Sequence, residues 1–253
     1  MQKDRGHPVS NAQATWSEFN SAAYHGDNYR IIRGDDRTML LTTVEWFARS
    51  GAQGCHGFDA GAGANLYPAL AMLPFCDKIT LLEFSPTNVR YLRRQVRRLD
   101  DSWEQFWEPV RPFAGGRDFA WARQRLAAIT EVTPGSILTG PPVREFTLGT
   151  MFWVAESLSN LPEEYEQANH NFLGALTPGA PYCAAYMEKS EGYVVDGIRY
   201  PATPVGKEDV TGSLSPRSSE LAVRHFDPDP APIRPGEPGY LVATGRVKEE
   251  TIS

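Results

Sequence analysis

Two acidic residues flank a glycine-rich turn in this sequence. Asp59 begins the run Asp-Ala-Gly-Ala-Gly-Ala-Asn, which contains Gly61, Gly63 and Asn65, and Glu83 follows Gly63 by 20 residues. Glycines let the backbone approach a ligand closely, and the amides that open the next helix face that ligand. A carboxylate at the tip of the following strand can accept hydrogen bonds from both hydroxyls of a ribose. The spacing therefore predicts a nucleoside site between the two acids.

The third glycine of a dinucleotide-binding turn is missing. Nicotinamide-dependent dehydrogenases carry it three residues after the second glycine, and Leu66 stands there in this chain. A site for S-adenosylmethionine binds no pyrophosphate and does not need that glycine. The pattern thus favours S-adenosylmethionine as the cofactor and leaves a nicotinamide-dependent oxidoreductase as the alternative.

The elements around this turn predict an open α/β fold. Helices are expected over 37–50, 66–73, 86–98 and 162–176, and strands up to Asp59 and over 78–83, 127–132, 146–154, 181–187, 221–226 and 240–246. Strands that alternate with helices imply right-handed crossovers and parallel pairing. We therefore expect an open, mostly parallel seven-stranded sheet with helices on both faces, with its ligand beyond the carboxyl ends of the strands. A proline-rich loop is expected over 227–238.

Composition limits the partners. The chain has 253 residues, a formal net charge of −6 at pH 7 and three cysteines without a Cys-x-x-Cys pair. This charge gives no general attraction to nucleic acid, and no apolar run approaches the roughly 20 residues that cross a bilayer. The cysteines favour neither a disulfide framework nor a metal site. We expect a single cytoplasmic domain, a monomer or homodimer, whose partner is a small molecule rather than nucleic acid, membrane or metal.

Five runs carry a family resemblance. They are Phe19-Asn20-Ser21-Ala22-Ala23-Tyr24 with Tyr29, Asp59 to Tyr67, Leu82-Glu83-Phe84-Ser85-Pro86-Thr87-Asn88, Thr130-Glu131-Val132-Thr133, and Arg199 to Val205. In these runs the sequence resembles the class I S-adenosylmethionine-dependent methyltransferases. More narrowly, it is similar to the nicotinamide, phenylethanolamine and indolethylamine N-methyltransferase family. The similarity extends from about Trp16 to Val210.

The resemblance implies a role for each matching residue. Residues 1–36 would form an N-terminal helical lid over a Rossmann-like core, 37–253, and Tyr24 and Tyr29 would close over the methionine part of the cofactor. Glu83 would hold the ribose, and Glu131 and Val132 would border the adenine. The implied cofactor-binding residues are Tyr24, Tyr29, Asp59, Gly61, Gly63, Asn65, Tyr67, Glu83, Phe84, Asn88, Glu131 and Val132.

The residues at the expected position of the methyl acceptor differ from those of that family. Counting back without gaps from Arg199, the position of the substrate aspartate in the nicotinamide enzyme falls on Tyr186, two residues before Glu188. Nicotinamide is therefore expected to be a poor substrate. Phe152 and Trp153 add an aromatic wall, which suits a small aromatic or hydrophobic acceptor. The predicted acceptor-binding residues are Phe152, Trp153, Tyr186 and Glu188.

The expected reaction is direct in-line transfer of the sulfonium methyl group, with N-methylation favoured. Four residues are assigned to catalysis, namely Tyr24, His25, Glu156 and Glu188. Of these, His25, Glu156 and Glu188 can each accept a proton, and their spacing prefers none of them. Two alternatives stay open: an O-methyltransferase of secondary metabolism, and a methyltransferase-like binding module without catalysis.

Overall fold

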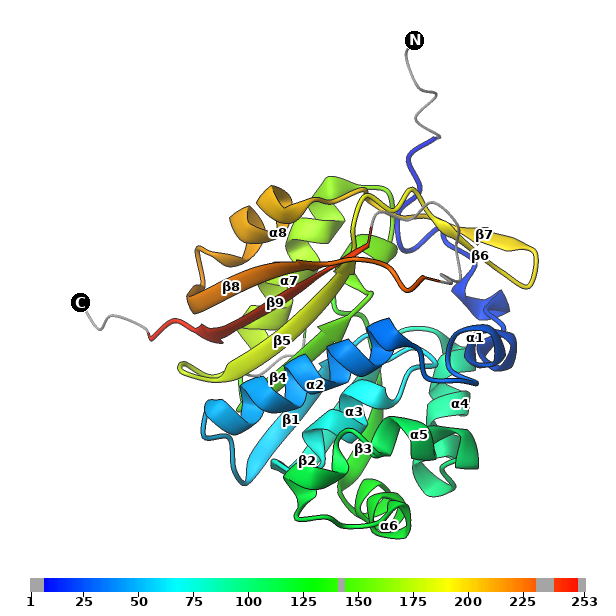
Figure 1. The fold of residues 1–253 in the computed structure, drawn as a ribbon. Coiled ribbons are helices and arrows are strands. Elements are labelled where there is room, and N and C mark those ends of the chain that lie inside the picture. Colours follow the sequence, from blue (N-terminus) through cyan, green and yellow to red (C-terminus); the bar gives the residue numbers. More distant parts are fainter. Residues whose placement is uncertain (1–6, 141–143, 231–238, 250–253) are drawn as a thin grey trace.

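A seven-stranded sheet forms the centre of the molecule (Figure 1), a computed structural model that describes residues 7–140, 144–230 and 239–249. The strands are ordered β3-β2-β1-β4-β5-β9-β8. Their bounds are β1 (Cys55–Ala60), β2 (Cys76–Glu83), β3 (Thr130–Pro134), β4 (Leu148–Phe152), β5 (Pro181–Met187), β8 (Ser218–Phe226) and β9 (Tyr240–Val247). β9 runs antiparallel to both of its neighbours, and the other pairs are parallel. The predicted mostly parallel sheet is confirmed.

Helices cover both faces of the sheet (Figure 1). On one face lie α2 (Gly34–Arg49), α3 (Tyr67–Met72), α4 (Pro86–Arg97), α5 (Glu104–Trp107) and α6 (Phe119–Ile129), and on the other α7 (Pro162–Ala175) and α8 (Lys207–Leu214). The pleat of β5 divides its side chains between the two layers. Cys183 and Ala185 pack into the core under α2, whereas Tyr182, Ala184 and Tyr186 pack into the core under α7.

Local chemistry sets the starts of the helices next to the turn. The hydroxyl of Ser85 accepts a hydrogen bond from the amide of Asn88 at 3.4 Å, and Pro86 takes the first helical position of α4. Serine caps and first-turn prolines both favour a helix start. At the start of α2 the Asp36 carboxylate accepts the backbone N–H of Arg33 at 3.3 Å. The helix expected over 37–50 therefore begins three residues earlier, at Gly34.

The predicted strand over 127–132 is misplaced. α6 continues to Ile129, because Leu126 is fully buried in the core and the alanines at 127 and 128 favour helix over strand. β3 therefore starts at Thr130, and its last residue, Pro134, pairs with Glu83. Glu131 is thus opposite Thr80 in the second of the five residue pairs between β3 and β2, and not at the carboxyl end of β3.

A small layer lies beyond the carboxyl ends of the strands (Figure 1). It contains η1 (Trp16–Glu18), α1 (Ser21–Asn28) and a hairpin of β6 (Tyr193–Val195) and β7 (Ile198–Tyr200). Phe19 packs against Val195 and Tyr200, so the N-terminal segment and the hairpin form one apolar cluster. The sequence predicted an N-terminal helical lid, and this hairpin was not predicted. Of the loop expected over 227–238, residues 231–238 lie outside the described part.

Three short 3-10 helices complete the described elements: η2 (Asp101–Trp103), η3 (Arg111–Ala114) and η4 (Ala155–Ser157). With α5 and α6, η2 and η3 account for the tryptophan-rich segment after α4. Within the three described ranges, every helix is too short or too polar to cross a membrane.

Candidate functional site

The turn after β1 is fixed against the end of β2. Gly61 and Gly63 have positive φ angles of 69° and 63°, where side chains other than glycine are strained. A Cβ atom on Gly61 would also come within 2.6 Å of the Val154 side chain. The amides of Gly61 and Ala62 donate to the carbonyl of Leu82 at 2.8 and 3.0 Å. These bonds hold the turn beside Glu83.

The Glu83 carboxylate accepts hydrogen bonds from two segments, the turn after β1 and the start of α4. It accepts the amide of Gly63 at 2.7 Å, the amide of Ser85 at 2.6 Å and the side-chain amide of Asn88 at 3.5 Å. Only 5% of Glu83 is exposed. Burial raises the pKa of this carboxyl, and the hydrogen bonds from Ser85 and Gly63 oppose the rise. The turn and the strand tip thus present one buried acid to the space beyond the sheet.

A cavity with about 720 Å³ of empty space, including its open mouth, lies at this edge of the sheet and is called the first cavity below. The sequence-predicted residues that line it are Tyr24, Tyr29, Gly61, Gly63, Asn65, Glu83, Phe84, Asn88, Phe152 and Trp153. The structure therefore brings together the turn, the tip of β2, the end of β4 and the aromatic lid. Phe84 is 44% exposed, which leaves an aromatic ring surface at the mouth.

Two polar atoms behind the turn lack partners among the described residues. Asp59 is 1% exposed; its Oδ1 accepts the hydroxyl of Thr150 at 2.8 Å, and its Oδ2 has no partner. Burial raises the pKa of Asp59 to about 8, the Thr150 hydrogen bond opposes the rise and the Glu83 charge adds to it. Asn65 accepts the amide of Tyr67 at 3.1 Å, and its Nδ2 has no partner. Beside the first cavity, a buried amide donor and one oxygen of a buried carboxyl are thus left without partners in the described part of the chain.

A second cavity with about 830 Å³ of empty space adjoins the first. Tyr24, Tyr29, Trp153, Ser157 and Tyr193 line both cavities. The remaining lining residues of the second cavity are Asn28, Arg33, Asp35, Asp36, Met187, Pro228, Gly239 and Tyr240. The two spaces therefore meet along one mostly aromatic wall.

Trp153, which lines both cavities, has an unusual backbone conformation. Its φ angle is +62°, which is uncommon for a residue other than glycine and concentrates at functional sites. Its amide donates to the carbonyl of Ala185 at 2.9 Å, and its indole N–H donates to the hydroxyl of the fully buried Tyr67 at 2.8 Å. The ring meets Tyr240 edge to face at 5.7 Å. These contacts hold the strained residue in place.

Three predicted residues of the acceptor half lie elsewhere. Tyr186 is fully buried under α7 and donates its hydroxyl to Asn169 at 2.7 Å. Glu156 accepts the amide of Met187 at 3.0 Å, and Glu188 pairs with His225 at 3.0 Å. None of these three is among the described residues that line either cavity. The β5 pleat explains the case of Tyr186, because it turns this side chain to the opposite face of the sheet.

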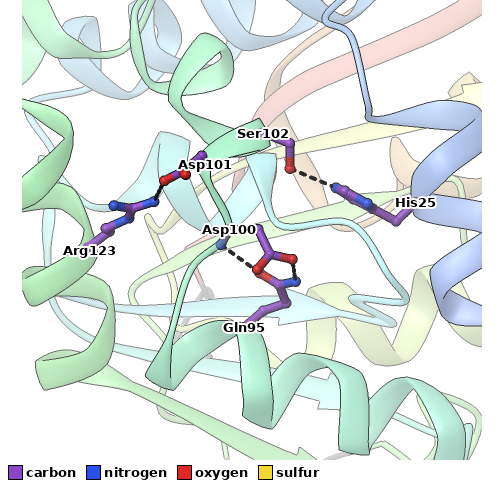
Figure 2. Close-up of polar contacts among 6 residues, drawn as sticks. All are labelled: His25, Gln95, Asp100, Asp101, Ser102 and Arg123. Carbon is purple, nitrogen blue, oxygen red and sulfur yellow. Dashed lines mark hydrogen bonds and ion pairs between the residues drawn. The ribbon is translucent and has the colours of Figure 1, made fainter.

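His25 also lies outside both linings. Figure 2 shows its ring directed at Ser102 in η2, with Nε2 3.2 Å from the hydroxyl. The ring packs 5.1 Å from that of Trp103, and burial lowers the pKa of His25. In the same view Asp100 contacts Gln95, and Asp101 contacts Arg123. Residues 100–102 are thus held by side-chain contacts, and His25 links α1 to them. This contact gives His25 a structural role.

The segment after β3, rather than β3 itself, reaches the first cavity. The Glu131 carboxylate pairs with Lys78 at 3.0 Å and accepts the hydroxyl of Thr80 at 2.9 Å, and the Lys78 hydrogen bond lowers its pKa. Val132 is half-buried against the core. Gly135, Ser136 and Ile137 line the cavity instead, and the Gly135 amide donates to the Glu83 carbonyl at 2.9 Å. The Pro-Gly-Ser turn that ends β3 was the sequence signal for this wall.

Other lining residues gave little sequence signal. Asn11 and Trp16 reach the first cavity from the N-terminal segment, and Tyr193 reaches both cavities from the hairpin. Asp35 and Asp36 look in sequence like the acids that commonly open a helix, and only the fold shows that they face a cavity.

Comparisons by sequence identify no relative: no protein-family model matches the chain, and no curated protein matches it. Comparison of structures is informative. The chain is similar to the N-methyltransferase NodS from Bradyrhizobium japonicum WM9, solved with S-adenosyl-L-homocysteine: 14% identity, 92% of this chain and 94% of that chain covered, TM-score 0.57. It is also similar to 1,6-didemethyltoxoflavin-N1-methyltransferase from Burkholderia thailandensis, solved with bound 1,6-didemethyltoxoflavin and S-adenosylhomocysteine: 14% identity, 90% of this chain and 85% of that chain covered, TM-score 0.56.

A third similar structure is the glycopeptide N-methyltransferase MtfA: 12% identity, 82% of this chain and 89% of that chain covered, TM-score 0.52. At these identities the likeness concerns the fold. The chain has the fold of the S-adenosylmethionine-dependent methyltransferases.

Proposed function

We propose that the protein binds S-adenosylmethionine in the first cavity and transfers its methyl group to a small aromatic or hydrophobic acceptor, with N-methylation favoured. One observation carries the proposal: the buried Glu83 carboxylate faces the same cavity as the Gly61–Asn65 turn. A ribose needs an acceptor of this kind at the tip of the second strand, and the glycines let the cofactor approach the backbone.

The groups beside the first cavity fit this cofactor. Its methionine end carries an ammonium and a carboxylate. The unpartnered Nδ2 of Asn65 is a donor of the kind that the carboxylate requires. The unpartnered Oδ2 of Asp59 becomes an acceptor when a cationic ammonium nearby favours the ionised form of this carboxyl. The exposed ring of Phe84 at the mouth suits a flat base such as adenine. We assign Glu83, Asn88, Asn65, Phe84 and the 135–137 segment to the cofactor. Asp59 would interact with the cofactor from behind the turn.

The chain's own contribution to catalysis is mainly positional. When bound, S-adenosylmethionine supplies a methyl group that its positive sulfur already activates. Tyr24, Tyr29 and Trp153 line both cavities, so they can exclude water from the junction and fix the direction from which an acceptor approaches. Orientation of two reactants can lower a barrier by several kcal/mol. The aromatic wall thus brings the acceptor and the methyl group together.

Support for a cytoplasmic site of action comes from the cysteines. Cys55, Cys76 and Cys183 are all buried free thiols, which suits a reducing compartment. We propose this location together with the small-molecule substrate.

Calorimetric titration tests the cofactor assignment. We expect micromolar binding of S-adenosylmethionine and S-adenosylhomocysteine, and no heat from NAD under the same conditions. Heat from NAD alone would replace the proposal by a nicotinamide-dependent oxidoreductase.

Initial rates then test the acceptor class. With S-adenosylmethionine present, we expect a phenylethylamine and an indole-ethylamine to be methylated faster than a phenol and faster than nicotinamide. A faster phenol would indicate O-methylation. Tight cofactor binding without turnover of any amine, phenol or carboxylate would indicate a binding module without catalysis.

A further inference from the structure

The second cavity carries an acid pair that the cofactor does not need. Asp35 and Asp36, in the first turn of α2, line it together with Arg33. Asp229 approaches the same helix end from the segment after β8, where it accepts the amide of Gly34 at 2.9 Å. Among the described lining residues Arg33 is the one cation beside the two acids, so the cavity has an excess of negative charge.

The contacts of the acid pair keep both side chains at the helix start. The Asp36 Oδ2 accepts the amide of Arg33 at 3.3 Å, and the Asp35 Oδ1 accepts the amide of Asp36 at 2.8 Å. Each of these two bonds engages one oxygen of its carboxylate. The acids are therefore oriented by the backbone, on the helix end that also favours negative charge.

Burial and mutual repulsion make Asp36 a base suited to neutral pH. Burial raises its pKa to about 7, the Asp35 charge adds to the rise, and the amide and charge of Arg33 oppose it. The more distant Asp229 also raises it. Among the described residues, the hydroxyls of Tyr29, Tyr67 and Tyr240 also interact electrostatically with Asp36. A pKa near the working pH is the optimum for proton transfer.

Much of the remaining lining of the second cavity is aromatic. Tyr24, Trp153 and Tyr193 are shared with the first cavity, and Tyr240 meets Trp153 edge to face. Aromatic faces attract cations as well as flat apolar rings. A ligand with an aromatic body and a cationic end would satisfy both the rings and the carboxylates.

We propose that the second cavity is the acceptor site and that it takes a primary or secondary aryl-alkyl amine in its ammonium form, with Asp36 accepting the ammonium proton. The inference rests on the proposed function, because it requires the methyl donor in the first cavity. It assigns acceptor recognition to the start of α2, and not to the end of β5, where the sequence had suggested Glu188.

The reaction balances with these groups alone. An N–H bond of the ammonium breaks and an O–H bond forms on Asp36, which leaves a lone pair on the nitrogen. That lone pair forms the new N–C bond to the methyl group while the C–S bond breaks and its electrons stay on sulfur. The product is the methylated ammonium, and Asp36 later returns its proton to water. An alcohol or phenol brings no positive charge to the acid pair, so the site selects nitrogen.

Binding to the complex with S-adenosylhomocysteine separates this inference from the proposed function. Calorimetry would compare 2-phenylethylamine and indole-3-ethylamine with the alcohols in which a hydroxyl replaces the amine. We expect each amine to bind at least about tenfold more tightly than its alcohol. If S-adenosylhomocysteine itself does not bind, the proposed function fails. If it binds and the amines show no preference, or neither class binds, only this inference is overturned.

The variants Asp36→Asn and Asp35→Asn test the acid pair. The asparagine keeps an oxygen for the helix cap, so we expect unchanged affinity for S-adenosylhomocysteine and a preference for amines reduced to less than about threefold. Glu45→Gln removes an exposed acid from the same helix and should leave the preference intact. If Asp36→Asn does not fold, Asp35→Asn decides. An unchanged preference in the folded variants overturns the inference.

A pH profile distinguishes proton transfer from mere attraction. With an amine acceptor, the initial rate of the wild type should rise as the pH rises through about 7, because Asp36 loses its proton there. Glu45→Gln should retain this limb and Asp36→Asn should lack it. The same limb in Asp36→Asn would show that another group accepts the proton.

Discussion

The two cavities share the mostly aromatic wall that includes Trp153, yet they are built in different ways. The polar groups of the first come largely from residues 61–88 and are fixed by backbone hydrogen bonds, such as Gly63 to Glu83 at 2.7 Å. The second joins segments far apart in sequence, as where the hydroxyl of Tyr240 donates to the carbonyl of Asp35 at 3.3 Å across 205 positions. The proposed cofactor site is thus encoded locally, whereas the proposed acceptor site is assembled by packing.

Because the two cavities are built differently, they should tolerate substitutions to different degrees. Replacing Gly61 would strain the turn and clash with Val154, so the cofactor half tolerates little. The second cavity draws its side chains from residues 24–36, the hairpin and the segments around β9. Loops on a rigid scaffold are where binding preferences diverge. Substitutions in the two halves should therefore have separable effects.

The largest expected effect tests the cofactor half. Glu83→Ala should weaken binding of S-adenosylhomocysteine by about 1.5–3 kcal/mol, the range for losing charge-assisted hydrogen bonds. Glu83→Gln, which keeps one acceptor oxygen, should lose less. The matched control is Glu131→Gln, because Glu131 pairs with Lys78 outside both linings. If Glu83→Ala melts and binds like the wild type, Glu83 does not hold the cofactor.

A second prediction concerns Asp59, the buried acid behind the turn. Burial raises the pKa of Asp59 from 3.8 to about 8. The folded protein therefore keeps a proton on this carboxyl that the unfolded chain releases above about pH 4. Stability should therefore fall as the pH rises from about 4 to about 8, by at most about 1.4 kcal/mol per pH unit from this group.

Urea unfolding of the cofactor-free protein measures this linkage. Between about pH 6 and 7.5, Asp59→Asn should abolish about 2 kcal/mol of the pH-dependent loss, because its neutral amide cannot ionise. Asp77→Asn, an exposed acid on β2, should keep the wild-type slope. Equal slopes in wild type and Asp59→Asn would mean that Asp59 is ionised in the folded protein.

A substitution of Trp153, which lines both cavities, should have a smaller effect. It should change acceptor binding more than cofactor binding. Trp153→Phe removes the N–H donated to Tyr67, which should lower stability by about 1 kcal/mol. We expect KM for an amine acceptor to rise about tenfold while affinity for S-adenosylhomocysteine falls less than about threefold. Trp121→Phe, on α6, is the control. A loss confined to the cofactor would assign Trp153 to the first cavity alone.

The smallest effect tests the residue suggested by the family resemblance. Tyr186→Phe removes only the hydroxyl that donates to Asn169 under α7. Stability should fall by about 1 kcal/mol, while the relative rates for amines, phenol and nicotinamide stay unchanged. A change in acceptor preference would require Tyr186 to influence a cavity that it does not line.

Much of the fold could be predicted because it follows local rules. Alternating strands and helices imply the parallel sheet, and Ser85-Pro86 marks a helix start. Prediction was less accurate where two local preferences competed. The alanines before Thr130 extend α6 rather than β3, and that error moved Glu131 to an expected strand tip which Pro134 occupies. The β6–β7 hairpin was missed, and its Tyr193 lines both cavities.

The sequence by itself determined the turn at Gly61 and Gly63 and the acid that follows on β2. Positive φ angles require glycine, and strand tips one crossover apart must meet at the same edge, so residue type and spacing suffice. Only the tertiary structure decided which side chains form the second cavity, the proposed acceptor site. A strand's pleat sends neighbouring side chains to opposite faces, which put Tyr186 under α7, and packing of α2 against β9 brought Asp35 to Tyr240. Spacing along the chain does not encode contacts of that kind.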